Sequence, residues 1–270
     1  MFVPPQRYLS ALALQTYTLC PLRFRFRYVD GLYWSRLLAL SPEDRKAIEK
    51  GQAFHLMARR LYEGLDPAAV ADPVEQQELE HWLGLLQSFL PRTLDRAYYP
   101  ELELRLNRPP LHLQAKYDLV VVDPDGSATI FDWKTERRPA GRSDLLKRPQ
   151  TLIYRYMLCA AGGAYSPTGS FRPEQVSMIY WNPLFPHRWE RLAYTSEQFA
   201  LDGQYLRALA ERLEATAPEE YAPTADPRTC ATCEYRTICH GIPAEAAAPT
   251  AADEPPPPSD DDWEPTLDLP

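Results

Sequence analysis

The residues of this chain best suited to chemistry are two carboxylates and a lysine with the spacing of β-strands. Asp118 opens an apolar run, and after the turn Asp-Pro-Asp-Gly the chain reads Ile-Phe-Asp-Trp-Lys, ending at Lys134. On a strand, residues two apart point to the same face, so Asp132 and Lys134 should project together, with Asp118 close by on the neighbouring strand. Two carboxylates suit Mg²⁺ or Mn²⁺, and the lysine could orient a metal-bound water or stabilise charge on a phosphate. Asp-x-Lys is common by chance, however, and a surface salt bridge at a strand end is the competing interpretation.

Two helical motifs flank the carboxylates and favour the chemical interpretation. Gly51 and His55 lie four residues apart in an expected helix, and Gln150 and Tyr154 repeat that spacing in the helix expected after Lys134. Residues four apart share one face of a helix. In order and spacing, the four motifs resemble those of the PD-(D/E)XK nuclease superfamily, and of its RecB-like nucleases in particular. In those proteins the histidine is a further metal ligand, while the glutamine and the tyrosine order the site and its DNA.

The resemblance implies a role for each residue of the site. The catalytic residues would be His55, Asp118, Asp132 and Lys134. The first three would hold the divalent ion, together with the backbone carbonyl of Trp133, and Lys134 would orient or activate the attacking water. Metal and lysine together would stabilise the pentacoordinate phosphate.

One departure from the family pattern and one extra acid accompany this set. Relatives often have a glycine a few residues before the first aspartate, whereas Ala115-Lys116-Tyr117-Asp118 has none, which leaves the geometry at the start of that strand open. Glu103 could add an acid from the preceding strand, but a surface strand position is the favoured interpretation.

Four of the five cysteines have the spacing of a metal or cluster site. Cys20 stands alone before Pro21, and Cys230, Cys233 and Cys239 form a C-terminal triad. Three such cysteines cannot form an even set of local disulfides, and four thiolates suit either a cubane iron–sulfur cluster or tetrahedral zinc. One distant cysteine with a C-terminal triad resembles the cluster of AddB and of the CRISPR-associated RecB-type exonucleases. The resemblance implies a [4Fe-4S] cluster, favoured here over zinc, that fixes both ends of the chain around the nuclease core.

Two residues near these motifs have simpler interpretations. Cys159 lies in the apolar helical stretch Tyr-Met-Leu-Cys-Ala and is interpreted as a small buried hydrophobic residue. His240 directly follows the last cysteine, and a bystander is favoured over an alternative ligand.

The elements that must position these residues follow from periodicity and capping signals. A long helix should begin at Ser41-Pro42, with Ser as the N-cap and acids in the first turn, and end near Gly64. Arg23 to Tyr28 alternates arginine with aromatic residues, which is typical of a strand or an extended helical turn with one buried face. The other expected helices are 8–17, 73–90, 143–160 and 196–215, and the expected strands are 101–106, 113–122, 128–134, 176–181 and 188–194.

The order of helix, three strands, helix and strand predicts an α/β fold with a mixed central sheet flanked by helices. The resemblance implies a restriction-endonuclease-like core with a helical N-terminal part and a C-terminal Cys-rich clasp. We expect an N-terminal segment with the first cysteine (1–40), the nuclease core (41–220), the Cys-rich cluster segment (221–242) and an acidic, proline-rich tail (243–270). The tail has too few apolar residues to offset its chain entropy, so we expect it to be disordered.

Charge is distributed unevenly along the chain. The formal net charge is −8, but residues 243–270 contain eight acids and no lysine or arginine, so the rest carries 29 basic and 29 acidic residues. A neutral body can still hold a basic groove, because phosphate binding needs local cationic charge rather than a high overall pI. The candidates are Arg23, Arg25, Arg27, Arg137, Arg138, Arg142, Lys147 and Arg148, and ordinary solvated surface is an equally good interpretation of them.

The expected function is that of a Mg²⁺- or Mn²⁺-dependent deoxyribonuclease, an exonuclease on DNA ends or single strands in DNA repair, recombination or CRISPR adaptation. DNA rather than RNA rests on the resemblance alone. Because no helicase motif is present, a helicase or CRISPR-adaptation partner would be a separate chain. The alternatives are a non-catalytic nucleic-acid-binding or assembly subunit with a retained nuclease fold, and a zinc-stapled protein whose Asp-x-Lys is accidental.

Location and the role of the tail follow from composition. The sequence has no apolar run of about eighteen residues and no secretory signal, so a cytoplasmic protein without a membrane partner is expected. The tail mixes acids with Trp263, Leu267 and Leu269. It could bind a protein partner or fold over its own DNA channel, although a solubilising role is favoured.

Overall fold

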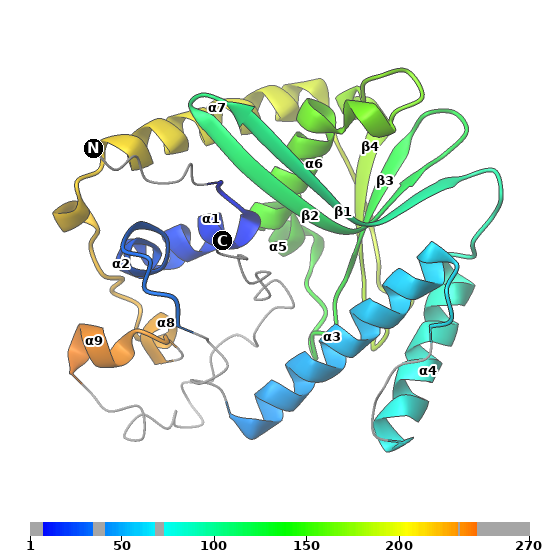
Figure 1. Ribbon diagram of the computed structural model, residues 1–270, viewed down its shortest axis with the longest axis horizontal. Coiled ribbons are helices and arrows are strands. Elements are labelled where there is room, and N and C mark those ends of the chain that lie inside the picture. The colour runs from blue at the N-terminus through cyan, green and yellow to red at the C-terminus, as the bar shows by residue number, and fades with distance from the viewer. Residues whose placement is uncertain (1–7, 35–40, 68–72, 232, 242–270) are drawn as a thin grey trace.

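A five-stranded mixed sheet forms the centre of the molecule, and helices cover both of its faces (Figure 1). The computed structural model describes residues 8–34, 41–67, 73–231 and 233–241. The strands are β1 (Ala97–Arg108), β2 (Leu111–Val122), β3 (Ala128–Trp133), β4 (Val176–Trp181) and β5 (Arg191–Ala193), and they lie in the sheet in that order. β1, β2 and β3 pair antiparallel, β3 and β4 pair parallel, and β5 returns antiparallel to β4. The expected α/β fold with a mixed, helix-flanked sheet is confirmed.

The helices divide between the two faces of the sheet. They are α1 (Ala11–Leu19), α2 (Pro21–Phe24), α3 (Pro42–Glu63), α4 (Pro73–Phe89), α5 (Arg142–Lys147), α6 (Pro149–Ala161), α7 (Ser196–Ala215), α8 (Pro227–Ala231) and α9 (Arg236–His240). The described residues also include a π-helical turn at Arg25–Val29 and short 3₁₀ helices at Gly162–Tyr165, Pro173–Gln175 and Pro218–Glu220. α3 and α4 lie against one face, whereas α1, α6 and α7 pack on the other (Figure 1).

An aromatic layer joins α3 and α4 to the sheet. Phe54 of α3 packs against Trp82 of α4 and against Trp181 of β4, with ring centroids 5.7 and 6.2 Å apart. Tyr62, two turns further along α3, stacks on Trp133 at 6.2 Å. Because the buried residues of α3 recur with helical periodicity, one face of this helix is fixed against the sheet while the other faces solvent.

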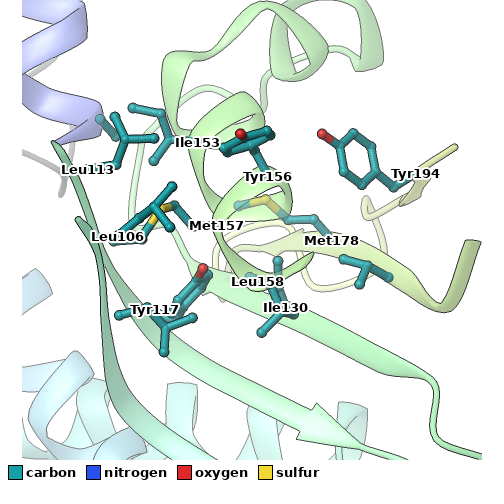
Figure 2. Packing of buried hydrophobic residues seen from close by; sticks show 14 of the residues in the cluster. Leu106, Leu113, Tyr117, Ile130, Ile153, Tyr156, Met157, Leu158, Met178 and Tyr194 are labelled. Carbon is teal, nitrogen blue, oxygen red and sulfur yellow. The ribbon is translucent and has the colours of Figure 1, made fainter. Parts of the chain in front are cut away.

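The opposite face is sealed by α6, which lies across the strands (Figure 2). Its Ile153, Met157 and Leu158 have no exposed surface and pack among residues of the sheet such as Ile130 and Met178. Full burial of a side chain of this kind contributes about 1.5–3 kcal/mol. The start of α6 is therefore held firmly above the sheet.

Capping and backbone signals explain where the helices begin and end. Ser41 accepts a hydrogen bond of 3.1 Å from the N–H of Asp44, and Gly64 ends α3 in the left-handed conformation at φ 79°, as expected. The single helix predicted over 143–160 is wrong. Arg148 has extended backbone angles, φ −63° and ψ 131°, because the residue before a proline disfavours the α conformation, so α5 ends there and α6 starts at Pro149.

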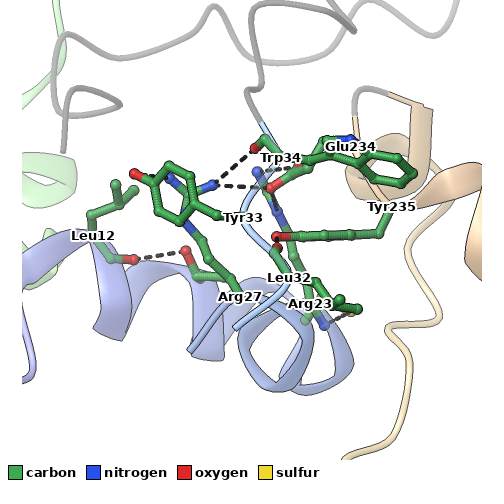
Figure 3. Close-up of polar contacts among 10 residues, drawn as sticks. Leu12, Arg23, Arg27, Leu32, Tyr33, Trp34, Glu234 and Tyr235 are labelled. Carbon is green, nitrogen blue, oxygen red and sulfur yellow. Dashed lines mark hydrogen bonds and ion pairs between the residues drawn. The ribbon is translucent and has the colours of Figure 1, made fainter. Parts of the chain in front are cut away.

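The N-terminal and C-terminal segments are joined by a buried ion cluster (Figure 3). Arg23 and Arg27 bind the carboxylate of Glu234 at 2.7 and 3.4 Å, and their side chains are 6%, 6% and 2% exposed. The segment from Arg23 to Tyr28 is helical rather than a strand. Residues four apart then lie on one face, which brings the two guanidinium groups to the same carboxylate.

Arg23 and Arg27 follow neither of the two interpretations that the sequence left open, a basic groove or solvated surface. Arg23 and Arg27 are neutralised inside the protein, and Arg25 is engaged by the carboxylate of Asp30 at 3.0 Å and the carbonyl of Pro218 at 2.8 Å. Their alternation with aromatic residues reflects packing instead. Phe26 and Trp34 lie against the ring of Tyr235, whose hydroxyl donates to the carbonyl of Leu32.

The tail at residues 243–270 and the boundaries between the expected parts of the chain stay as predictions. The acidic tail, with its expected disorder and partner-binding roles, lies outside the described residues, and the proposed boundaries between parts remain untested. Among the helices of the described ranges, none combines the length and apolar character needed to cross a membrane.

Replacing Glu234 with alanine should lower the free energy of unfolding by about 3–5 kcal/mol, since two arginines would stay buried without their shared carboxylate. Urea denaturation followed by tryptophan fluorescence measures this. Glu63→Ala is the control, because its carboxylate pairs with Arg59 on the surface of α3, and loss of such a pair should cost at most about 0.5 kcal/mol. Equal stabilities of the two variants would show that the buried cluster does not hold the ends together.

Candidate active site

The two carboxylates lie where β2 and β3 separate. The last pair of that ladder is Leu119 with Phe131, and the next pair in register would be Asp118 with Asp132. Instead of continuing the ladder, the N–H of Trp133 donates to Asp118 Oδ2 at 2.7 Å. A side-chain carboxylate thus replaces a backbone acceptor, and both aspartates are left at the open end of the ladder.

Asp132 is buried and is held from two sides. Its Oδ1 lies 2.8 Å from Lys134 Nζ, and its Oδ2 accepts a hydrogen bond of 2.6 Å from Gln150 Nε2. All three residues are at most 5% exposed. The N–H of Lys134 donates to the carbonyl of Trp181 at 2.8 Å, which extends the β3–β4 ladder by one residue and fixes the lysine backbone. The structure places Asp132 and Lys134 on the same side, as their spacing predicted.

Asp118 is paired with the histidine of α3. His55 Nδ1 lies 3.1 Å from Asp118 Oδ1, and the two side chains are 21% and 18% exposed. Burial raises the pKa of Asp118, but the charge and hydrogen bond of His55, the charge of Lys134 and the N–H of Trp133 together outweigh it, so its pKa is lowered. Asp118 is therefore a carboxylate at neutral pH, next to a group that can also bind a metal.

The helix after the lysine supplies the second support of the site. Gln150 lies in the first turn of α6 and reaches Asp132, whereas Tyr154, one turn later, packs its ring against Tyr117 at 4.8 Å. Tyr117 OH donates to the carbonyl of Tyr154 at 3.0 Å. Gln150 thus orders one carboxylate directly, and Tyr154 fixes the residue that precedes the other, Asp118.

Tyr180 is a neighbour of the site that the sequence alone does not reveal. It pairs with Asp132 in the parallel β3–β4 register. Lys134 Nζ and Arg148 Cζ lie 5.7 and 5.3 Å from the centre of its ring, a distance at which cation–π attraction operates. Arg148 also binds Glu136 at 3.0 Å. No local pattern signals Tyr180, because only the pairing of strands far apart in the chain brings it here.

The backbone opposite Asp118 is unusual. Glu101 lies between the pairs Pro100–Leu119 and Leu102–Tyr117, and it has a left-handed φ of 52°. Non-glycine residues adopt this conformation at a cost, and such strain often accompanies functional sites. The strained residue lies on β1, opposite Asp118, and not in the stretch Ala115-Lys116-Tyr117 that leads to this aspartate.

Glu103 does not join the site. Its side chain is exposed and binds the guanidinium of Arg105 at 2.6 Å. The surface strand position favoured from the sequence is confirmed.

The four cysteines of the predicted cluster line one small pocket. Cys20 is buried at the start of α2, while Cys230 and Cys239 lie on the short helices α8 and α9. Burial raises the pKa of Cys233 to about 11, and burial together with the nearby Cys20 raises the pKa of Cys230 and Cys239. His240 lines the same pocket and is exposed.

The side chains of both sites carry the donor atoms that the expected metal ion and the expected cluster need. In neither site do these side chains already enclose a metal position. Within the described ranges, no three His, Cys, Asp or Glu side chains are arranged so that they could hold a metal ion. In the active site the carboxylates instead contact the ammonium of Lys134 and the imidazole of His55. Two carboxylates with an imidazole suit a hard divalent ion, and four thiols at one pocket suit iron–sulfur or zinc.

A larger cavity of about 790 Å³ lies elsewhere, between the β1–β2 turn, the end of α6, and α7. Cys159 lines it, half-buried against the core, and burial raises the pKa of this thiol to about 12. None of the residues around the two aspartates borders this cavity. We therefore place the chemistry at the open end of the β2–β3 ladder.

Comparison with known proteins concerns the chain as a whole rather than single residues of the site. The model of the PD-(D/E)XK nuclease superfamily matches residues 8–240. No curated protein sequence matches the chain. Among solved structures, the protein SSO0001 aligns over 89% of both chains with 16% identity and a TM-score of 0.41. A candidate exonuclease from Eubacterium rectale aligns over 80% of this chain and 83% of its own, with 10% identity and a TM-score of 0.47.

Gln150→Ala should lower the free energy of unfolding by about 1–3 kcal/mol, because a buried carboxylate oxygen of Asp132 loses its donor. Chemical denaturation of the metal-free protein measures the change. Gln76→Ala is the matched control, since that amide donates at 2.8 Å to the exposed Glu80. A loss for Gln150→Ala no larger than for the control would show that Gln150 does not support the site.

Proposed function

We propose that this chain, which belongs to the PD-(D/E)XK nuclease superfamily, is a nuclease that hydrolyses DNA with the help of Mg²⁺ or Mn²⁺. The observation that carries the proposal is the meeting of Asp118, Asp132 and Lys134 at the open end of one strand ladder. The lysine and one carboxylate are 2.8 Å apart and almost fully buried. Burying a charge pair costs desolvation free energy, so such a pair adds little to stability. Its position at the open end of a strand ladder favours a catalytic role.

The residues of the chain divide the work. Asp118, Asp132 and His55 would hold the divalent ion, joined by the backbone carbonyl of Trp133. When bound, this ion would polarise the phosphate and lower the pKa of a coordinated water. Gln150 keeps the Asp132 carboxylate in one orientation through its 2.6 Å hydrogen bond.

Lys134 is the group we propose to act on the water and the phosphate. Its ammonium lies between Asp132 and the ring of Tyr180, and its backbone is fixed by the bond to Trp181. A preorganised cation in a water-poor position stabilises negative charge on a phosphate more strongly than a solvated one does. It could also orient the attacking water for in-line attack.

DNA, and within it single strands or ends, is the substrate we propose. The order of motifs resembles RecB-like nucleases, which supports exonucleolytic cleavage in repair, recombination or CRISPR adaptation. A helicase or a CRISPR-adaptation protein would then be a separate partner chain. Two of the predicted basic groove residues, Arg142 and Arg148, are engaged by Glu190 and Glu136 near the site, so the free cationic charge is smaller than the sequence suggests.

Lys134→Ala and Asp132→Asn should each reduce cleavage of end-labelled DNA by about two orders of magnitude or more, because each removes a group placed at the scissile phosphate. Gel analysis of single- and double-stranded substrates with Mg²⁺ or Mn²⁺ measures this. Lys50→Ala is the control, because this lysine of α3 pairs with Glu78 of α4 at 2.6 Å rather than with either aspartate, and the variant should cleave normally.

Metal binding has a separate readout. Mn²⁺ should raise the melting temperature of the wild type and not that of an Asp118→Asn, Asp132→Asn double variant. A folded wild type that responds to Mn²⁺ but cleaves no DNA would point instead to a nucleic-acid-binding or assembly subunit.

We also propose a [4Fe-4S] cluster held by Cys20, Cys230, Cys233 and Cys239. The proposal is supported by the shared pocket of these thiols and by the ion cluster of Glu234, which brings the two segments together. The cluster would cross-link residue 20 to the C-terminal segment and so close a loop of more than two hundred residues. Its role would be structural.

Anaerobically purified wild type should be brown and contain about four iron atoms per chain. Cys20→Ser should lose iron and colour, whereas Cys159→Ser should keep both, because Cys159 lines the distant cavity. Visible absorption and iron analysis measure the result. A colourless wild type with one zinc per chain would overturn the iron–sulfur assignment and favour a zinc staple.

A further inference from the structure

Two loops meet at the edge of the sheet where Lys134 lies. β3 and β4 run parallel, so both end at this edge, and β5 begins there because it runs antiparallel to β4. The segment that follows β3, residues 134–148, includes α5. The β4–β5 loop, residues 182–190, joins β4 to β5. Any chain that crosses this edge to reach the active site passes these two segments.

The two segments hold a local surplus of positive charge. Together they carry seven lysine or arginine side chains and three acidic ones, in a body that is otherwise close to neutral. Two of the acids, Glu136 and Glu190, are already bound by Arg148 and Arg142 at 3.0 and 2.8 Å.

Two cations are exposed beside these pairs. Arg137 and Arg188 lie at the surface, and within the described part of the chain neither forms an ion pair. They are therefore available to phosphates.

An exposed aromatic ring lies next to one of these cations. Trp189 is 44% exposed, and one side of it packs edge-to-face on Phe89 with ring centroids 5.2 Å apart. Phe89 in turn stacks on Trp181 at 5.5 Å. The indole is thus supported from the core by an aromatic chain while nearly half of its surface faces solvent.

The loop that carries Trp189 is tied to the active-site segment. Asn182 donates to the carbonyl of Glu136 at 2.8 Å, and its side-chain oxygen accepts the N–H of Leu184 at 2.8 Å. Arg142 bridges the same two segments through Glu190. The exposed ring is therefore fixed at the same end of the sheet as the backbone of Lys134.

We propose that the β4–β5 loop is a binding subsite for a single strand of nucleic acid, with a base stacked on Trp189 and phosphates at Arg188 and Arg137. An aromatic ring flanked by cations is the combination that binds single strands without sequence preference. A duplex keeps its base faces covered and has none to offer the indole, so the single strand is the better fit. The subsite rests on the proposed nuclease function and would align the strand that leads to Lys134.

Binding of a fluorescein-labelled oligothymidylate to the full-length protein tests the subsite, with EDTA present so that no cleavage occurs. Trp189→Ala should weaken binding by about 5- to 150-fold, the range of one base–aromatic stack, and Trp189→Phe should restore most of it. Tyr205→Ala is the control, because this aromatic residue of α7 is 48% exposed and lies in a different element. Its affinity should equal that of the wild type.

Salt dependence separates the phosphate contact from the stack. Arg188→Ala should reduce the slope of log affinity against log salt by about 0.7, as expected for one lost phosphate contact on a single strand. Trp189→Ala should leave that slope unchanged while lowering the affinity at every salt concentration.

The results distinguish this subsite from the nuclease activity. Wild-type affinity in both Trp189→Ala and Arg188→Ala, or no binding by the wild type itself, would overturn the subsite even if Lys134-dependent cleavage is present. Weaker binding in those variants, with no cleavage by the wild type, would support the subsite and contradict the proposed nuclease activity. An affinity loss that Trp189→Phe does not restore would likewise overturn the stacking contact.

Discussion

The separation of β2 and β3 beyond Leu119 and Phe131 is the feature on which the site depends. Beyond that pair, the backbones of Asp118 and Asp132 no longer pair with each other, and their carboxylates lie at the open end of the β2–β3 ladder. Like charges so placed repel one another unless each has its own partner. Here one aspartate faces His55 and a backbone N–H, and the other is held by Lys134 and Gln150. The partners come from both sides of the sheet, so the site needs α3 and α6 to be fixed on opposite faces. The two apolar clusters supply that rigidity.

A second constraint is the joining of the segment around Arg23 to the segment around Glu234. Glu234 draws the helical turn of Arg23 and Arg27 onto the C-terminal segment, and Tyr235 packs among aromatic residues of the same turn. Arg23 and Arg27, which the sequence offered as candidates for a phosphate-binding groove, form this contact instead. As a result, Cys20 and the C-terminal cysteines already share a pocket. Preorganised thiols reduce the entropy cost of closing so long a loop around a cluster.

The edge of the sheet gathers the groups that would meet a substrate. Segments distant in sequence reach it because β3 and β4 are parallel and β5 returns beside them. This places Lys134, Tyr180 and Trp189 at one end of the sheet, although they belong to three different strands or loops. Ligands of open α/β sheets commonly bind outside the carboxyl ends of the strands. The large cavity between α6 and α7 lies away from this edge and carries none of these groups.

The sequence by itself determined most of the local elements and which residues the candidate site would contain. Strand spacing placed Asp132 with Lys134, helical spacing put His55 and Gln150 on helices that flank the sheet, and capping signals located α3, because each depends on neighbours within a few residues. The break at Pro149 was also local, but the single helix predicted over 143–160 ran across it. Only the tertiary structure decided which charges are partners. Glu234 takes up Arg23 and Arg27 across some two hundred residues, and strand register brings Tyr180 to Asp132, and neither contact leaves a local pattern. Such contacts depend on how distant segments pack, and that is settled by burial and register of the whole chain rather than by spacing along it.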